Sequence, residues 1–589
     1  MRGRFGSGTP AGAEAAAPER EWVAAEVFRR LRSRSLAKAR AAVQAVPASA
    51  FVRLVLDLQD VAAGAGAAAL EGTDGVAQVI AQFEGVFLPA AAWEGHVLPA
   101  RVRDYRPAML DELVASGDVM WVGSDHDADE QGGAAARPSG RAAAKAVPSS
   151  GLVAFFPTDS PLAPVRSEAS FGQEAVASFD AVGRPCNAED AEAGQATVGQ
   201  AVAEALAGGG LFFRQIADAV RRRLAPERVD EARIAAALWE LVWDGRATND
   251  TFAPVRALDA GGSAGPARTA PRRRVSSRRG RHRGYDAAPA YRESVAADRY
   301  GGGGMPAGAL SGRWSLVAPS PANDTVRAVA LVESLLDRYG VLSRDIALLA
   351  GVPGGLGTLM PVLRSLEDVG DVLRGMFVEG MGPAQFAARE TVDVLRSYAA
   401  QDVHADDGRE AHMVVLAADD PACLFGAALP WPPVAGGTAQ GADEGTPDVA
   451  ADASASGAAA DASAPGAADP ANGHVPDAGQ PGALRPTRRP GSLVVLRSGV
   501  PVLHATAALR SLLSFTSDGE ALEAAARALA AHTARMLVRD GADGARKKIV
   551  VETFDGAPVL STPFADVLQK AGFVRLPDGM RLYVDPFAR

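Results

Sequence analysis

The chain has 589 residues, which is enough for several domains of about 100 to 200 residues each. Hydrophobic residues make up 48% and charged residues 22%, as in ordinary globular proteins, and the formal net charge of −10 argues against a general nucleic-acid coat. Two cysteines, Cys186 and Cys423, cannot supply a disulfide framework or a four-ligand zinc site.

One pattern recurs along the chain: a short apolar helix, a Gly or Asp-Gly break, and then a strand. It occurs at residues 110–122, 238–252 and 362–377. Before the last occurrence, helical spacing covers 326–339, and Ser343 is a good N-cap for a helix over 343–350. Three helices followed by a β ribbon are typical of a winged helix, so we predict tandem winged-helix domains.

Two segments differ in composition from the rest. Within residues 256–306, the stretch from Arg268 to Arg283 contains eight arginines and no acidic residue, and we predict an Arg-rich flexible linker over 256–306. Residues 435–484 contain seven acidic residues and no Lys or Arg. The segment is rich in Ala, Gly and Pro, and these residues can bury too little apolar surface to offset the entropy of ordering. We therefore predict a disordered acidic linker.

The rest of the chain alternates between strand and helix patterns. Strands are expected at 413–416, 493–496, 501–503 and 511–515, which indicates a β-barrel. A helix over 520–539, a strand over 549–552, a helix over 563–571 and two further strands indicate a small terminal α/β lobe. The predicted fold class is therefore α+β.

The expected domains follow these boundaries: a helical or winged-helix unit at 1–72, a winged helix with a polar insertion at 73–190, a winged helix at 191–255, the Arg-rich linker at 256–306, a winged helix at 307–400, the β-barrel at 401–434 and 485–518, the acidic linker at 435–484 and the α/β lobe at 519–589.

Several protein classes are not expected. No apolar run approaches the ~18 residues of a membrane span, and no secretory signal pattern is present, so we expect a cytoplasmic protein. No phosphate-binding G-x-x-x-x-G-K-[ST] loop occurs, because the glycine cluster at 351–357 has no following Lys. We therefore expect no ATPase activity in this chain, no cofactor and no metal.

The chain resembles the C-terminal half of long-form bacterial large helicase-related (Lhr) proteins. The stretches that carry the resemblance are Glu21-Trp22-Val23 with Arg29 to Arg32, Val97 to Val102 with Asp104-Tyr105, Gly312 to Leu316, Phe377 to Gly382 with Ala384 to Phe386, and Gly426 to Pro432. The resemblance implies tandem winged helices with a β-barrel, a homo-oligomer with a tetramer expected, and a separate helicase core as partner. It also implies a similarity to AlkZ/YcaQ-type DNA glycosylases.

Those glycosylases carry a Gln-x-Gln or Gln-x-Asp signature, and the comparable stretch here is Gln82-Phe83-Glu84. Glu84 would be the general base or charge stabiliser, with Gln82 beside it. Asp585, near a Pro after a strand, is a second carboxylate candidate. The alternative for all three is an ordinary surface or turn role.

The candidate DNA contacts are arginines and one glutamine. Arginine forks bind phosphates and release counterions without reading sequence. The candidates are Arg101, Arg103 and Arg106 around Tyr105, then Arg272, Arg273, Arg274, Arg278, Arg279, Arg281 and Arg283, and finally Gln385. Solvated surface arginines are the alternative, and for Gln385 the alternative is packing.

Three functions follow as hypotheses. The first is a DNA-binding module, for single-stranded or duplex DNA, of an Lhr-type repair helicase. The second is a metal-independent DNA glycosylase that removes damaged or uracil-like bases. The third is a structural oligomerisation scaffold.

Overall fold

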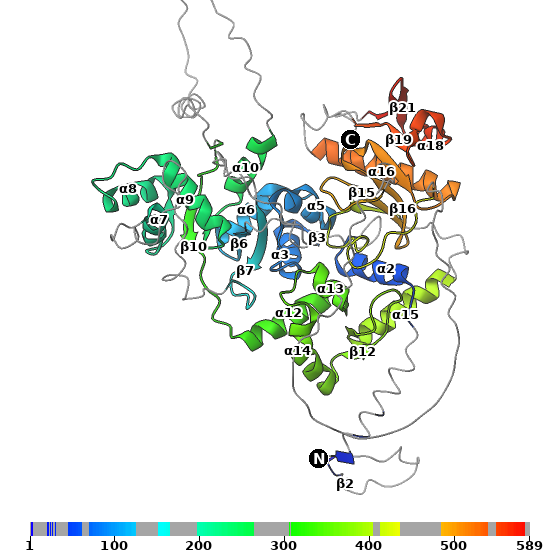
Figure 1. The fold of residues 1–589 in the computed structure, drawn as a ribbon, viewed down its shortest axis with the longest axis horizontal. Helices are drawn as coiled ribbons and strands as arrows, with labels where there is room; N and C mark the ends of the chain where they lie inside the picture. Colours follow the sequence, from blue (N-terminus) through cyan, green and yellow to red (C-terminus); the bar gives the residue numbers. More distant parts are fainter. Residues whose placement is uncertain are drawn as a thin grey trace, which may run out of the picture. The chain divides into compact units, whose positions relative to one another are not determined.

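The computed structural model describes most of the chain in separate stretches: residues 45–61, 70–124, 151–164, 197–263, 305–306, 308–403, 413–435, 485–539 and 549–583, with a few isolated positions before residue 45. It divides into two compact parts (Figure 1). The first comprises Met1–Pro430 with Arg497–Val500, and the second comprises Trp431–Leu496 with Pro501–Arg589. Near the N-terminus the short strands β1 (Arg2–Gly3) and β2 (Glu21–Trp22) pair antiparallel.

Three winged helices lie in the first part, and their sheets share one strand order. In each, the first strand in sequence pairs with the third, and the third pairs with the second: β4-β7-β6, β8-β10-β9 and β11-β13-β12. We call them winged helices A, B and C. The predicted tandem winged-helix architecture is thus present, and the α+β class with it.

Winged helix A extends from residue 70 to 164. Its helices and strands are β3 (Leu70–Glu71), α3 (Gly72–Gln82), β4 (Leu88–Pro89), α4 (Ala90–Ala92), the π-helix η1 (Trp93–Val97), α5 (Leu98–Arg101), β5 (Val102–Arg103), α6 (Pro107–Ser116), β6 (Val119–Ser124) and β7 (Leu152–Pro157). Helix α6 ends at Gly117, whose left-handed φ of 84° suits glycine. The polar stretch expected between β6 and β7, residues 125–150, lies outside the described residues.

Winged helix B follows. Its elements are α7 (Val198–Leu206), β8 (Leu211–Phe212), α8 (Phe213–Arg223), α9 (Glu231–Trp243), β9 (Ala247–Asn249), α10 (Ala253–Ser263) and β10 (Arg313–Leu316). Thr197 caps α7 through Gln200 N, and Asp230 caps α9 through Arg233 N.

Two expected boundaries are wrong in this region. Strand β10 pairs with β8 and β9, so residues 313–316 complete winged helix B and do not belong to the unit expected from 307. The Arg-rich segment therefore lies between two strands of one wing rather than between two domains. Its first residues are also helical, because α10 continues to Ser263.

Winged helix C contains α12 (Asp324–Tyr339), β11 (Val341–Leu342), α13 (Arg344–Leu349), α14 (Leu356–Val369), β12 (Leu373–Gly375), β13 (Gln385–Ala387) and α15 (Arg389–Val403). The predicted N-cap at Ser343 is confirmed, since its side chain accepts from Ile346 N. Helix α2 (Ala48–Leu58) packs on α12 and α15. Most of the other residues of the expected unit at 1–72 lie outside the described residues, so that boundary stays a prediction.

Winged helices A and B share one hydrophobic core. Trp93 and Trp121 of A and Trp239 and Trp314 of B lie in the same buried cluster. Trp239 stacks on Trp243 at 5.4 Å and meets Trp314 edge-on at 5.4 Å. Strands β6 and β7 can approach Trp243 because Gly123 and Gly151 face it, where a Cβ on either glycine would lie 2.7 Å from its ring.

Among its described residues, the second part contains two sheets and the helices α16 and α18. Its elements are β15 (Leu493–Arg497), β16 (Val500–Ala505), η5 (Ala507–Leu509), β17 (Ser511–Ser514), α16 (Gly519–Arg539), β18 (Ile549–Val551), β19 (Thr553–Phe554), β20 (Ala557–Pro558), η6 (Val559–Ser561), α18 (Phe564–Lys570), β21 (Phe573–Leu576) and β22 (Gly579–Leu582). Strand β14 (Met413–Ala417) precedes Pro430 in the first part.

No closed barrel forms among the described residues, which corrects the expected β-barrel at 401–434 and 485–518. Strands β15, β16, β17, β19 and β20 follow one another in an open order. Strand β17 pairs in parallel with β19, which lies well beyond the expected barrel boundary. Strands β18, β22 and β21 form a separate antiparallel sheet.

Candidate nucleic-acid interface

The wing of winged helix B holds both ends of the Arg-rich segment. Asn249 at the end of β9 donates to Ser311 O at 3.0 Å, and Asp250 Oδ1 accepts from Arg313 N at 2.7 Å. Asp250 N donates to Arg313 O at 3.0 Å. Ala309 is fully buried in the core that winged helices A and B share. The chain thus continues from β9 into α10, and it returns at residues 311–313 within hydrogen-bonding distance of Asn249 and Asp250.

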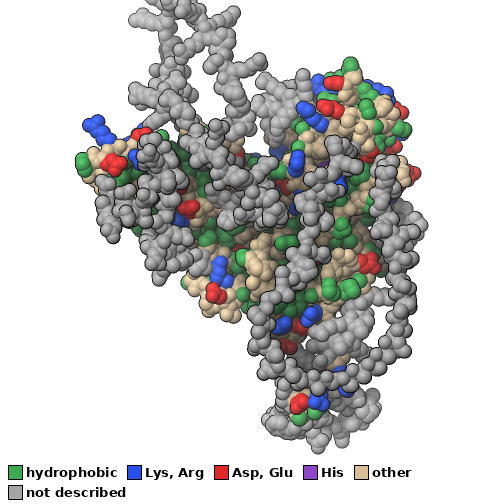
Figure 2. Space-filling view, in the orientation of Figure 1, with side chains coloured by type: hydrophobic (Ala, Val, Ile, Leu, Met, Phe, Trp, Pro, Cys, Tyr) green, Lys and Arg blue, Asp and Glu red, His purple; other side chains and the backbone are tan. Residues whose placement is uncertain are grey.

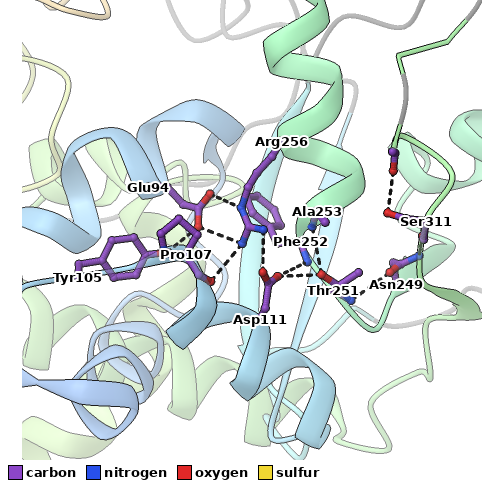
Figure 3. A network of polar contacts seen from close by, with 11 residues as sticks. Glu94, Tyr105, Pro107, Asp111, Asn249, Thr251, Phe252, Ala253, Arg256 and Ser311 are labelled. Carbon is purple, nitrogen blue, oxygen red and sulfur yellow. Dashed lines mark hydrogen bonds and ion pairs between the residues drawn. The ribbon is translucent and has the colours of Figure 1, made fainter. Parts of the chain in front are cut away.

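A network of ion pairs fixes α10, from which the segment departs (Figure 3). Arg256 on α10 donates from Nε to Glu94 Oε2 at 2.6 Å and from Nη1 to Asp111 Oδ2 at 2.7 Å. Tyr105 OH donates to Glu94 Oε1 at 2.6 Å. Glu94 lies in the π-helix η1 and Asp111 in α6, so Arg256 joins winged helix B to winged helix A. We call Arg256, Glu94, Asp111 and Tyr105 the Arg256 network.

Burial, hydrogen bonds and neighbouring charges shift the pKa values of three groups in this network. Burial by itself would raise the pKa of Asp111, but hydrogen bonds from Arg256, Phe252 N and Thr251 lower it overall. Burial would lower the pKa of Arg256, and its two carboxylate partners raise it instead. The pKa of Tyr105 is raised by burial and by Glu94. Arg256 thus lies between the side chains of Glu94 and Asp111, and Asp111 is a partly buried ion-pair partner.

The predicted catalytic pair lies at the end of α3. Gln82 Nε2 donates to Leu58 O at 2.5 Å, and Gln82 O accepts from Arg338 Nε at 2.9 Å. The carboxylate of Glu84 is half-buried and accepts from Ser160 Oγ at 2.7 Å. Burial raises the pKa of Glu84, although Ser160 and Arg338 act in the opposite direction. A half-buried carboxyl with a raised pKa is a group suited to proton transfer.

Arg101 is buried, whereas a residue that contacts a DNA phosphate has to be accessible at the surface. Its side chain is fully buried and pairs with Asp420 through Nη1 and Nη2 at 3.0 and 2.8 Å. Nη2 also donates to Gln59 Oε1 at 3.0 Å, and the guanidinium lies 4.7 Å from the ring centre of Phe83. Arg101 is a buried structural cation, and its predicted role in a phosphate clamp is corrected accordingly.

The other two arginines of that clamp are exposed but do not surround an exposed aromatic ring. Arg103 pairs with Glu71 at 2.6 Å on the surface. Arg106 precedes α6 and is exposed. Tyr105 between them is 6% exposed, and its hydroxyl is engaged by Glu94, so it offers no stacking face.

Gln385 holds the wing of winged helix C together. It is fully buried on β13, and its Oε1 accepts from Phe377 N and Val378 N at 2.8 and 2.9 Å. Its Nε2 donates to Val378 O, Met381 O and Gly382 O at 2.9, 3.1 and 3.1 Å. Every polar atom of its side chain is thus used inside the wing, which corrects the predicted DNA contact in favour of packing.

The third helices of the winged helices differ in what they expose. Helix α9 buries eight of its residues against its surroundings and presents Arg233 and Glu240 outward. Helix α6 presents Glu112. Helix α14 presents Gly357, Thr358, Pro361, Arg364 and Ser365, and its first acidic residue is the buried Glu367.

Several predicted site residues lie outside the described residues. They are Arg272, Arg273, Arg274, Arg278, Arg279, Arg281, Arg283 and Asp585. Within the described stretches, no three His, Cys, Asp or Glu residues gather as a metal site would require. No helix among them is both long and apolar enough to cross a membrane.

Comparisons with known proteins agree with this geometry. Residues 46–137 and 321–407 each match a family profile described as "Large helicase-related protein, winged-helix domain", the third and the fourth of that family. The resemblance to Lhr proteins is confirmed. These two matches correspond to winged helix A with α2 and to winged helix C.

Two curated relatives match nearly the whole chain. The "Lhr helicase/uracil glycosylase" of Escherichia coli (strain K12) is 35% identical over 570 residues, which cover 95% of this chain and 30% of that protein. The "Lhr helicase/ probable uracil glycosylase" of Mycolicibacterium smegmatis (strain ATCC 700084 / mc(2)155) is 35% identical over 572 residues, with the same coverage. The chain thus spans less than a third of the length of either Lhr relative.

The Arg256 network is the part of this chain that the sequence did not predict. Arg256 and Glu94 are separated by 162 residues, so no local spacing connects them. One signal was available: a lone Arg before a basic run, in a helix that packs on apolar neighbours, is poorly explained as a solvated linker residue.

Proposed function

We propose that this chain is a DNA-binding module of an Lhr-type repair protein. The observation that carries the proposal is the placement of the Arg-rich segment between β9 and β10, both held by hydrogen bonds, in the wing of a winged helix. A wing commonly lies along the DNA backbone, and eight arginines there would bind phosphates and release counterions.

Helix α14 supports the same function. A third helix that enters the major groove needs a polar face without acidic residues near its N-terminal end. Among the three third helices, α14 has this surface, with Thr358, Arg364 and Ser365 exposed. Helix α9 is largely covered, so winged helix B would contact DNA through its wing.

The expected assembly belongs to the proposal. The partners are DNA, single-stranded or duplex, a separate helicase core, and further copies of the chain in a homo-oligomer, expected to be a tetramer. A purely structural scaffold is the outcome if the chain assembles without binding DNA.

Two variants with substitutions at the same eight positions, one without the charge and one with it, test the proposal. Replacing the eight arginines from Arg268 to Arg283 by Gln should weaken duplex binding by about tenfold or more at low salt, because counterion release is lost. Replacing the same residues by Lys keeps the charge and should retain most of the affinity. Equal affinity of the Gln variant and the unchanged chain, measured by fluorescence anisotropy, would reject the role of this segment.

A DNA glycosylase is the second candidate, and the half-buried Glu84 favours it. Its raised pKa, its bond from Ser160 and the neighbouring Gln82 are consistent with a general acid or base. The names of both relatives include uracil glycosylase activity. Asp585 remains a second carboxylate candidate for this activity.

Release of uracil from a uracil-containing oligonucleotide separates these possibilities. If Glu84 acts in proton transfer, Glu84→Gln should reduce the rate by about 100-fold, and the rate of the unchanged chain should depend on a carboxyl pKa above 4.5. Asp585→Asn tests the other candidate. Full activity of both variants would exclude these carboxylates, and activity absent from the unchanged chain would leave the DNA-binding module.

A further inference from the structure

The sheet β18-β22-β21 has one buried face and one open face. Ile549, Leu582 and Phe573 are cross-strand neighbours, and all three are buried. The next row, Val550, Arg581 and Val574, points to the opposite side because side chains alternate along a strand. Val550 and Arg581 are partly exposed there, and Val574 on the edge strand is 49% exposed. The open face therefore has an apolar row with a cation at its centre.

Tyr583 completes this face. It lies two residues after Arg581 and so on the same side of the chain as it leaves β22. Its side chain is 54% exposed, and the Arg581 guanidinium lies 4.3 Å from the centre of its ring. The two side chains thus form a stacked cation–π pair at the end of a small open sheet. In Figure 2, hydrophobic, Lys or Arg, and Asp or Glu side chains are interspersed in this region of the surface.

Arg581 differs from the neighbouring cations in its partners. Arg575 pairs with Asp566 at 2.5 Å, and Lys570 lies 3.4 Å from Glu523. No carboxylate of the described residues pairs with Arg581, and its Nε is buried without a hydrogen-bond partner. An anionic ligand over this face would supply a pairing charge for the Arg581 guanidinium, whereas an apolar protein surface would not.

We propose that the open face of β18-β22-β21 binds single-stranded nucleic acid, with a base stacked on Tyr583 and a phosphate bound by Arg581. Aromatic rings with adjacent arginines on open sheets suit unpaired bases, since every base has a face to stack. In duplex DNA the bases are stacked on one another and are not available to Tyr583. The inference rests on the proposed DNA-binding function, and it assigns the binding of single strands to this sheet.

The test compares single-stranded with duplex binding by the full chain. The probes are a fluorescein-labelled oligothymidylate of about 20 nucleotides and a duplex of the same length. Tyr583→Ala should weaken single-strand binding about tenfold and leave duplex binding unchanged. Tyr583→Phe keeps the ring and should bind like the unchanged chain, while Arg581→Gln should weaken single-strand binding several-fold.

The outcomes separate this inference from the function on which it rests. Tyr583→Ala with unchanged single-strand affinity would overturn the inference alone, as would an equal loss for single strands and duplex. A change in the oligomer mass of Tyr583→Ala by light scattering would assign the face to a second copy and also overturn it. If the unchanged chain binds neither probe, the DNA-binding function fails, and the inference fails with it.

Discussion

Winged helices B and C have the same strand order but expose different parts to solvent. In B, the third helix α9 buries eight residues, and the wing holds a long Arg-rich segment between β9 and β10. In C, the third helix α14 has an open polar face, and the wing between β12 and β13 is short and bonded internally by Gln385. Under the proposed DNA-binding function, one fold would therefore contact DNA in two different ways: through a charged wing in B and through a helix face in C.

The difference follows from packing. Helix α9 lies in the core that A and B share. Its Trp239 and Trp243 belong to the same buried cluster as residues of winged helix A, and Trp239 contacts Trp314 of β10. A helix held in a core on most of its sides cannot enter a groove. We infer that winged helix B, whose third helix is packed in the core, would use the segment between β9 and β10 to contact DNA. Winged helix C would use its exposed third helix α14.

Removal of Gln385 should produce the largest effect on the C wing. Gln385→Ala leaves two backbone N–H groups and three carbonyl oxygens in the wing without their partner, and we expect a loss of about 3 kcal/mol in the free energy of unfolding. Denaturant unfolding measures it. Glu379→Ala, an exposed change in the same wing, is the control and should alter stability little; equal stability of both variants would contradict the internal role of Gln385.

Disruption of the Arg256 network should destabilise the base of the B wing to a smaller extent. Asp111→Asn weakens the pair with Arg256 and should cost about 2 kcal/mol at neutral pH. Because the folded state lowers the pKa of Asp111, this contribution is present above its ordinary value of 3.8 and is lost as the pH falls through the folded-state pKa. The adjacent Glu112→Gln should change neither stability nor its acid dependence. An Asp111→Asn variant with unaltered acid unfolding would exclude this stabilisation.

The smallest expected effect concerns the exposed helix faces. Arg364→Gln on α14 should weaken duplex binding about threefold, as expected for one lost phosphate or base contact. Arg233→Gln on α9 removes the same charge from a helix that we place away from the groove, and it should leave affinity unchanged. A larger loss for Arg233→Gln than for Arg364→Gln would reverse the assignment of roles to B and C.

The sequence predicted the repeated units well because each carries its own local signals. Apolar spacing marked the helices ending at 116, 243 and 369, and Ser343 marked a helix start that the structure confirms. Strand pairing was predicted less well, because β10 joins β9 across an interval of more than 60 residues, and no local pattern records such a partner.

The roles of single polar residues were the least predictable. Arg101 and Gln385 are of residue types that often contact DNA, yet both are buried. Arg101 pairs with Asp420, which is 319 residues away, and Gln385 bonds to the backbone of its own wing. Burial of a cation depends on whether a carboxylate such as Asp420 arrives from elsewhere in the chain. Sequence alone gives the residue type but not the environment that determines its role.

The salt dependence of duplex binding tests the central claim, that the Arg-rich wing of B supplies phosphate contacts. The slope of log K against log salt measures the number of phosphates neutralised, at about −0.9 per contact for B-form DNA. Deletion of residues 268–283 should flatten this slope by several units relative to the unchanged chain. An unchanged slope would show that the wing contributes no phosphate contacts and would contradict the account.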